Sequence, residues 1–144
     1  EISECLVGSE MCIRDRLTAM LNTIPLEITF VDEDNINRFF NEGPKDFKRP
    51  GMAIDREVFS CHPPKVEQQV RRIIGEFRKG TLDKVPIWME KNGKTMLVTY
   101  MAVRDATGTY LGTMELVQDM GFAKEHFLSD VKAKEAALRA GMED

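Results

Sequence analysis

The sequence predicts an α+β fold: a five-stranded antiparallel sheet, helices inserted between strands two and three, and a further helix at each end. Two observations support this prediction. In five segments, alternate residues would place their side chains on opposite faces of a sheet, as in a β-strand. Most of these segments are joined by short turns rich in Asp, Asn and Gly. Elsewhere, apolar residues recur every three to four positions, as on one face of a helix. Strands joined by short turns form antiparallel sheets, and helices cover such sheets.

The first half of the chain predicts a helix, a hairpin and a longer helix. One helical face ends at Pro25 and consists of Leu17, Met20, Leu21 and Ile24. Residues 26–41 alternate around a polar turn and predict the hairpin. Residues 65–79 predict the longer helix, because a proline pair suits its first turn and a glycine follows its last.

The second half predicts three strands and a last helix. The strands are expected at residues 85–90, 94–104 and 110–118, and the helix at residues 122–140. One face of the middle strand carries Met96, Val98, Tyr100 and Ala102. On the last strand we expect Gly112, Met114 and Leu116 to face the helices. Glu115 should then face the other way, since side chains alternate along a strand.

Length and composition predict one domain, and the N-terminal sequence predicts a non-native segment before it. The chain has 144 residues, of which 42% are hydrophobic, enough for a single core. Residues 6–16, LVGSEMCIRDR, match one reading frame of the end of a transposase-based sequencing-library adapter. We therefore expect residues 1–16 to be non-native and their two cysteines to have no function. The expected organisation continues with a domain at residues 17–122 and a helical connector at residues 123–144.

Several function classes are disfavoured by the sequence. A net charge of −4 argues against a groove that binds nucleic-acid phosphates. No apolar run approaches the ~20 residues that a bilayer crossing needs. Three cysteines, an odd number, argue against a disulfide framework and indicate a cytoplasmic protein, while two histidines are too few for a multi-ligand zinc site. No phosphate-binding loop, nucleophile elbow or HExxH motif occurs, so we expect a non-catalytic protein.

Three stretches resemble the PAS sensor domain family. Residues 28–36, ITFVDEDNI, resemble its opening pair of strands, and residues 104–112, RDATGTYLG, resemble its last hairpin. Residues 118–120, QDM, resemble the motif that ends the final strand and leads into an output helix. The resemblance implies a curved five-stranded sheet that cups a pocket against short helices. It also implies a role in sensing and signalling.

A narrower resemblance concerns residues 58–65, VFSCHPPK, with Phe39-Phe40 before them and residues 110–113 after them. This set is similar to the PAS module of bacterial proteins that also carry a hemerythrin-like domain. The resemblance implies such a domain, or another output domain, in the parent protein. It also implies a small-molecule ligand, or a partner's surface, at the sheet-and-helix pocket.

Cys61 and His62 allow three interpretations. They precede a predicted helix, whose N-terminus stabilises a thiolate, so Cys61 could be a redox-reactive thiol. His62 could instead ligate a haem iron in the pocket, the only case in which we expect a metal. In the third interpretation, His62 or Ser60 caps the helix and Cys61 is a small buried residue.

The sequence therefore predicts a sensory module that binds a small ligand and requires no particular cofactor. The candidate pocket residues are Phe40, Cys61, His62, Tyr100, Met114 and Leu116. The alternatives are a structural dimerisation module, and a haem or thiol redox sensor that uses Cys61-His62. We also expect a homodimer that pairs the apolar helix at residues 17–24 with the outer face of the sheet.

Overall fold

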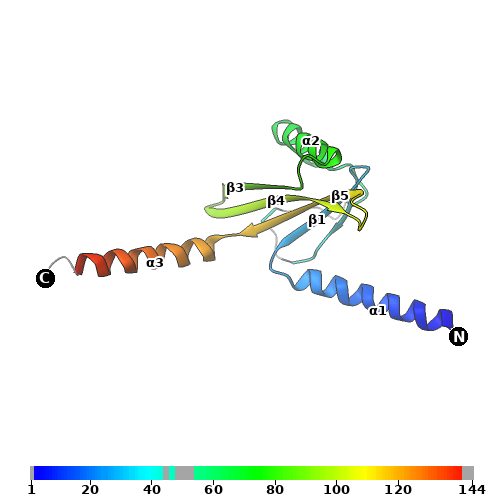
Figure 1. Cartoon of the computed structure of the whole chain (residues 1–144), viewed down its shortest axis with the longest axis horizontal. Coiled ribbons are helices and arrows are strands. Elements are labelled where there is room, and N and C mark those ends of the chain that lie inside the picture. The colour runs from blue at the N-terminus through cyan, green and yellow to red at the C-terminus, as the bar shows by residue number, and fades with distance from the viewer. Residues whose placement is uncertain (1, 44–45, 48–53, 141–144) are drawn as a thin grey trace.

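A computed structural model of the chain describes residues 2–43, 46–47 and 54–140, with the backbone alone for residues 2–11 and Cys61. Five antiparallel strands form one sheet in the order β2-β1-β5-β4-β3 (Figure 1). The predicted fold is confirmed. The elements are α1 (Ile2–Thr23), β1 (Glu27–Asp32), β2 (Asn37–Phe40), the 3-10 helix η2 (Val58–Cys61), α2 (Pro64–Lys79), β3 (Lys84–Lys91), β4 (Lys94–Arg104), β5 (Tyr110–Asp119) and α3 (Gly121–Ala140).

The main core lies between α2 and one face of the sheet, here called the inner face. α2 begins at the predicted proline and ends where Gly80 adopts a left-handed conformation with φ of 74°. Its buried residues recur at helical spacing because one side of the helix packs on the sheet. They are Val70, Ile73, Ile74 and Phe77. Across from them, β4 contributes the predicted face that includes Met96, Val98 and Tyr100.

The expected orientation of β5 is wrong. Tyr100 pairs with Glu115 and Val98 pairs with Val117, so Glu115 shares the inner face with Tyr100. Met114 and Leu116 therefore point to the opposite, outer face. The cause is a β-bulge between Val103 and Arg104, which shifts the pairing by one residue. A shift of one residue moves every following side chain to the other face of the sheet.

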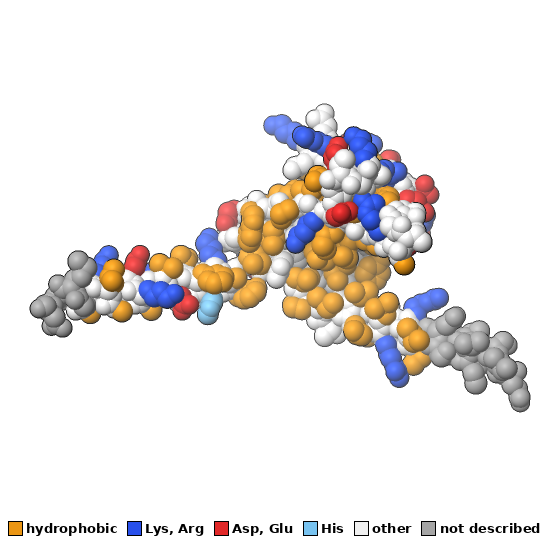
Figure 2. All heavy atoms as spheres, viewed as in Figure 1, with side chains coloured by type: hydrophobic (Ala, Val, Ile, Leu, Met, Phe, Trp, Pro, Cys, Tyr) orange, Lys and Arg blue, Asp and Glu red, His pale blue; other side chains and the backbone are white. Residues whose placement is uncertain are grey.

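The outer face and the two terminal helices expose apolar side chains (Figure 2). Trp88 on β3 is 60% exposed. α3 has no buried residue among those described. α1 exposes Ile13, Leu17 and Met20, and Ile24, the residue after its last turn, continues this stripe. The C-terminal end of α1 is fixed to the sheet by Asn41, whose amide donates to the carbonyls of Leu21 and Leu26.

The structure extends the first helix well beyond the prediction, since α1 begins at Ile2 rather than near Leu17. Residues 12–20 are all exposed, and the first contacts to the sheet lie near Leu21. Deleting residues 1–16 should therefore change the melting temperature by only about a degree or two, because little packing is lost. Differential scanning calorimetry of the full and shortened chains measures this difference. A large drop would show that the segment contributes to the stability of the domain.

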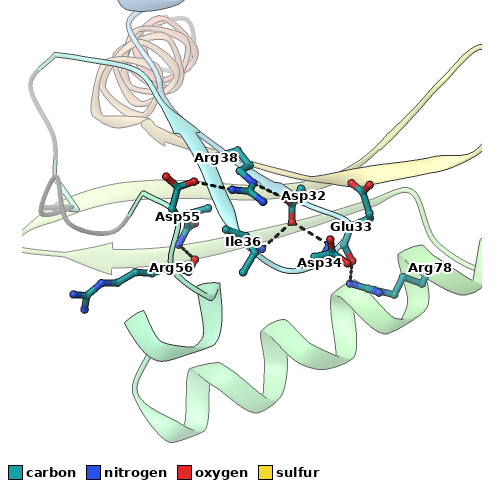
Figure 3. Close-up of polar contacts among 9 residues, drawn as sticks. Asp32, Glu33, Asp34, Ile36, Arg38, Asp55, Arg56 and Arg78 are labelled. Carbon is teal, nitrogen blue, oxygen red and sulfur yellow. Dashed lines mark hydrogen bonds and ion pairs between the residues drawn. The ribbon is translucent and has the colours of Figure 1, made fainter.

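The turn between β1 and β2 is organised by Asp32 (Figure 3). Its Oδ1 accepts hydrogen bonds from the backbone N–H groups of Asp34 and Ile36, and its Oδ2 accepts one from Arg38 Nε at 2.5 Å. Arg38 also contacts Asp55 at 2.7 Å. Burial opposes ionisation of Asp32, but the hydrogen bonds from Ile36, Arg38 and Asp34 outweigh it and hold the pKa below the usual value.

We expect the Asp32 carboxylate to stabilise the fold above the pKa it has in the unfolded chain. Because the folded-state pKa is lower, this stabilisation is lost as the pH falls through the folded-state value. Asp32→Asn should lower the free energy of unfolding at pH 7, and the difference from the parent protein should shrink in acid. Urea titrations at several pH values measure it. Asp34→Asn, an exposed change in the same turn, is the control, and equal effects of the two variants would contradict the prediction.

Candidate functional site

A cavity of about 420 Å³ lies between the N-terminal half of α2 and the inner face of the sheet. Residues from six parts of the chain line it, so it forms only when the fold is complete. Ligand pockets in proteins are typically apolar hollows of about 300–1,000 Å³ with a few placed polar groups. The lining residues are Phe47, His62, Pro63, Val66, Gln69, Val70, Ile87, Met89, Lys91, Val98, Tyr100, Glu115 and Val117.

Most of the cavity wall is apolar because two periodicities meet there. Val66 and Val70 are four residues apart on α2 and so share one helical face. Ile87 and Met89 are two residues apart on β3 and share the inner face. Val98 continues the same row onto β4. An apolar body of moderate size fits such walls.

His62 enters the cavity wall from the segment between η2 and α2. Its Nδ1 lies 2.9 Å from the carbonyl oxygen of Val58, which can only accept, so Nδ1 carries the proton. In the neutral ring, Nε2 is then an acceptor. The expectation that His62 or Ser60 caps α2 is wrong, because Pro63 occupies the N-cap position and no side-chain cap hydrogen bond is made there.

Glu115 contributes a carboxyl group to the cavity lining, although alternation along β5 predicts it on the opposite face of the sheet. Glu115 is only 8% exposed, and it pairs across the sheet with Tyr100. It also interacts with other groups of the chain. The position of Glu115 depends on the β4–β5 hairpin. One extra residue there reverses which β5 side chains face α2.

Lys91 supplies a positive charge to the same cavity. Its Nζ lies 3.2 Å from the centre of the Phe47 ring, an arrangement in which the ring face attracts the ammonium. Lys91 is half-buried at the end of β3. The cavity therefore carries both a cationic and an anionic side chain, with apolar walls between them.

The six candidate pocket residues are distributed over both faces of the sheet. His62 and Tyr100 line the cavity. Phe40 pairs with Thr29 and so lies on the inner face, beyond the cavity lining, while Met114 and Leu116 lie on the outer face. The side chain of Cys61 lies outside the described residues. Within the described part of the chain, no three His, Cys, Asp or Glu side chains are grouped as a metal site would require.

Comparisons with known proteins agree with this architecture. The sequence matches the PAS domain family over residues 17–121, which is most of the chain. The chain belongs to the PAS family. PAS domains are typically sensory or signalling modules. No functionally curated protein matches the sequence.

Solved structures show how this PAS domain relates to others. The C-terminal domain of a protein from Streptococcus mutans is 40% identical, with a TM-score of 0.73, and the match covers 77% of this chain and 87% of that one. The PAS domain of a Colwellia psychrerythraea protein is 14% identical, with a TM-score of 0.54 and coverage of 76% and 98%. A sensory box sensor histidine kinase from Vibrio cholerae is 13% identical, with a TM-score of 0.51 and coverage of 83% and 98%.

The last two relatives share the fold alone. The helices of this PAS domain, over the residues described, include none that is both long and apolar enough to span a bilayer.

Proposed function

We propose that this PAS domain is a non-catalytic sensory module that binds a small ligand in the cavity beneath α2. The observation that supports this proposal is the cavity itself, about 420 Å³ in volume, with apolar walls and the polar side chains of His62 and Glu115. A purely structural domain gains stability by filling such a space, because an unfilled apolar cavity weakens packing. A ligand would supply the missing contacts.

Strand β5 connects the cavity to the C-terminal helix, so ligand binding can affect the rest of the protein through β5. Glu115 and Val117 line the cavity, and β5 ends at Asp119, directly before α3. α3 extends away from the sheet (Figure 1). The junction is held by the backbone N–H of Met120, which donates to the carbonyl of Thr95 at 2.8 Å. A displacement of β5 on ligand binding would therefore change the direction of α3.

A thermal-shift screen of small molecules tests ligand binding. We expect at least one compound to raise the melting temperature, since a ligand that binds only the folded state stabilises it. NMR should place that compound at the cavity. Val66→Phe adds bulk to the cavity wall and should weaken binding about tenfold, while Val131→Phe on exposed α3 should not. Compounds that bind only elsewhere, or none that bind, would contradict the proposal.

A second copy of the chain is the proposed partner of the α1 stripe. Leu17, Met20 and Ile24 are spaced by three and four residues, so they share one side, and all three are exposed. We expect this stripe to pack against the exposed outer face of the sheet in the second copy. Met20 is 64% exposed, so Met20→Asp should spare the fold and convert the dimer to a monomer in sedimentation experiments. Val131→Asp on α3 is the control. A parent protein that sediments as a monomer at tens of micromolar would contradict the proposal.

The parent protein is proposed to carry an output domain of the hemerythrin-like type. Support comes from the resemblance of residues 58–65, and from the Streptococcus mutans relative, which is itself the C-terminal domain of a larger protein. The full open reading frame, recovered from the source DNA, should encode such a domain in the same chain. A reading frame that encodes a different output domain would contradict this part of the proposal.

A further inference from the structure

The cavity places opposite charges at different ends of an apolar path. Across the sheet, one row joins Val85, Tyr100 and Glu115, and the next joins Ile87, Val98 and Val117. A third row contains Met89 and Met96, and Lys91 follows it. Val85 and Lys91 are six positions apart on β3, about 20 Å of strand. The carboxylate and the ammonium are thus separated by two apolar rows.

The two charged groups differ in what already surrounds them. Glu115 is buried and interacts with other groups of the chain. Lys91 contacts the face of the Phe47 ring, and the described residues offer it no carboxylate within ion-pair distance. An ammonium group has three N–H donors, and an aromatic face can accept at most one of them. Lys91 therefore has donors available for an incoming anion.

We infer that the cavity binds an apolar monocarboxylate, with the carboxylate on Lys91 and the apolar body along the inner face of the sheet. This inference rests on the proposed function. A carboxylate matches the ammonium in charge and accepts its hydrogen bonds. The apolar body gains from burial against Ile87, Met89 and Val98.

The part of the cavity that Glu115 lines limits the ligand chemistry. Glu115 is engaged by other groups of the chain and lines the part of the cavity away from Lys91. Lys91 is the one Lys or Arg among the described lining residues, so a second carboxylate on the ligand would be buried there without a cationic partner. The cavity should therefore exclude dicarboxylates of the same length.

Four eight-carbon probes test the inference: octanoate, octanedioate, octylamine and 1-octanol. Isothermal titration calorimetry of the whole chain measures affinity, and NMR shifts at Val98 and Val117 report the location. We expect octanoate to bind at least about tenfold more tightly than the other three, as for one charge-assisted hydrogen bond. Lys91→Met should reduce the affinity for octanoate to that for 1-octanol. Lys84→Met, on the same strand but the outer face, should leave it unchanged.

The outcomes separate this inference from the sensory proposal. Octylamine or octanol binding in the cavity as tightly as octanoate would overturn the carboxylate inference and support a ligand-binding cavity. Octanoate that fails to bind, or binds equally to Lys91→Met, would overturn the inference as well. The sensory proposal is judged separately by the thermal-shift screen. Octanedioate that binds as tightly as octanoate would count against the exclusion of dicarboxylates.

Discussion

Phe77→Ala is expected to lower the free energy of unfolding by about 4 kcal/mol, since removal of a buried phenylalanine leaves a cavity and loses apolar contact. The Phe77 side chain is fully buried, at 0% exposure, within the core between α2 and the sheet. Domains of this size have only about 5–15 kcal/mol of stability in total. The loss should be visible as a large shift of the urea midpoint with an unchanged slope.

The matched control is Phe127→Ala on α3. Phe127 is 66% exposed, so the same chemical change should alter the free energy of unfolding by no more than about 0.5 kcal/mol. Similar effects of the two substitutions would show that α2 does not close the core. A loss below about 2 kcal/mol at Phe77 would instead show that α2 moves to fill the space left by the smaller side chain.

Local signals were sufficient to predict which elements form. The proline pair and Gly80 determine the bounds of α2, since proline suits a first helical turn and glycine suits a left-handed C-cap. The inner face of β4 followed from alternation alone. These features depend on residues that are neighbours in sequence, so no knowledge of the tertiary structure was needed.

The candidate site was harder to predict because it depends on contacts between distant segments. His62 and Tyr100 were expected in the pocket and line the cavity, whereas Lys91 was not considered. Its role depends on Phe47, which lies far away in the sequence and approaches β3 only in the folded domain. Composition and periodicity carry no information about such a pair.

The orientation of β5 failed for a specific physical reason. If the Arg104–Tyr110 pairing continued without irregularity, Tyr100 would pair with Met114, and Met114 would share the inner face as the sequence predicts. The bulge adds one residue to β5, and Tyr100 pairs with Glu115 instead. Alternation could not reveal this, because the outer face of this sheet is also apolar. A buried glutamate and an outward methionine are the result.

Gly112→Ala is expected to lower the free energy of unfolding by about 3 kcal/mol or more, because Gly112 lies beside this bulge, in a conformation that side chains rarely adopt, with φ of +155°. A Cβ there would lie 2.2 Å from the carbonyl oxygen of Val31 and 2.8 Å from the Phe30 ring. The oxygen belongs to the paired strand β1, so it cannot move without disturbing the sheet.

Gly75→Ala in α2 is the matched control, since its Cβ would meet nothing within 4 Å and alanine should stabilise the helix by about 1 kcal/mol. Urea unfolding of both variants should therefore give changes of opposite sign. A loss below about 1 kcal/mol at Gly112 would mean that the bulge tolerates a side chain, and that the register placing Glu115 in the cavity does not depend on this glycine.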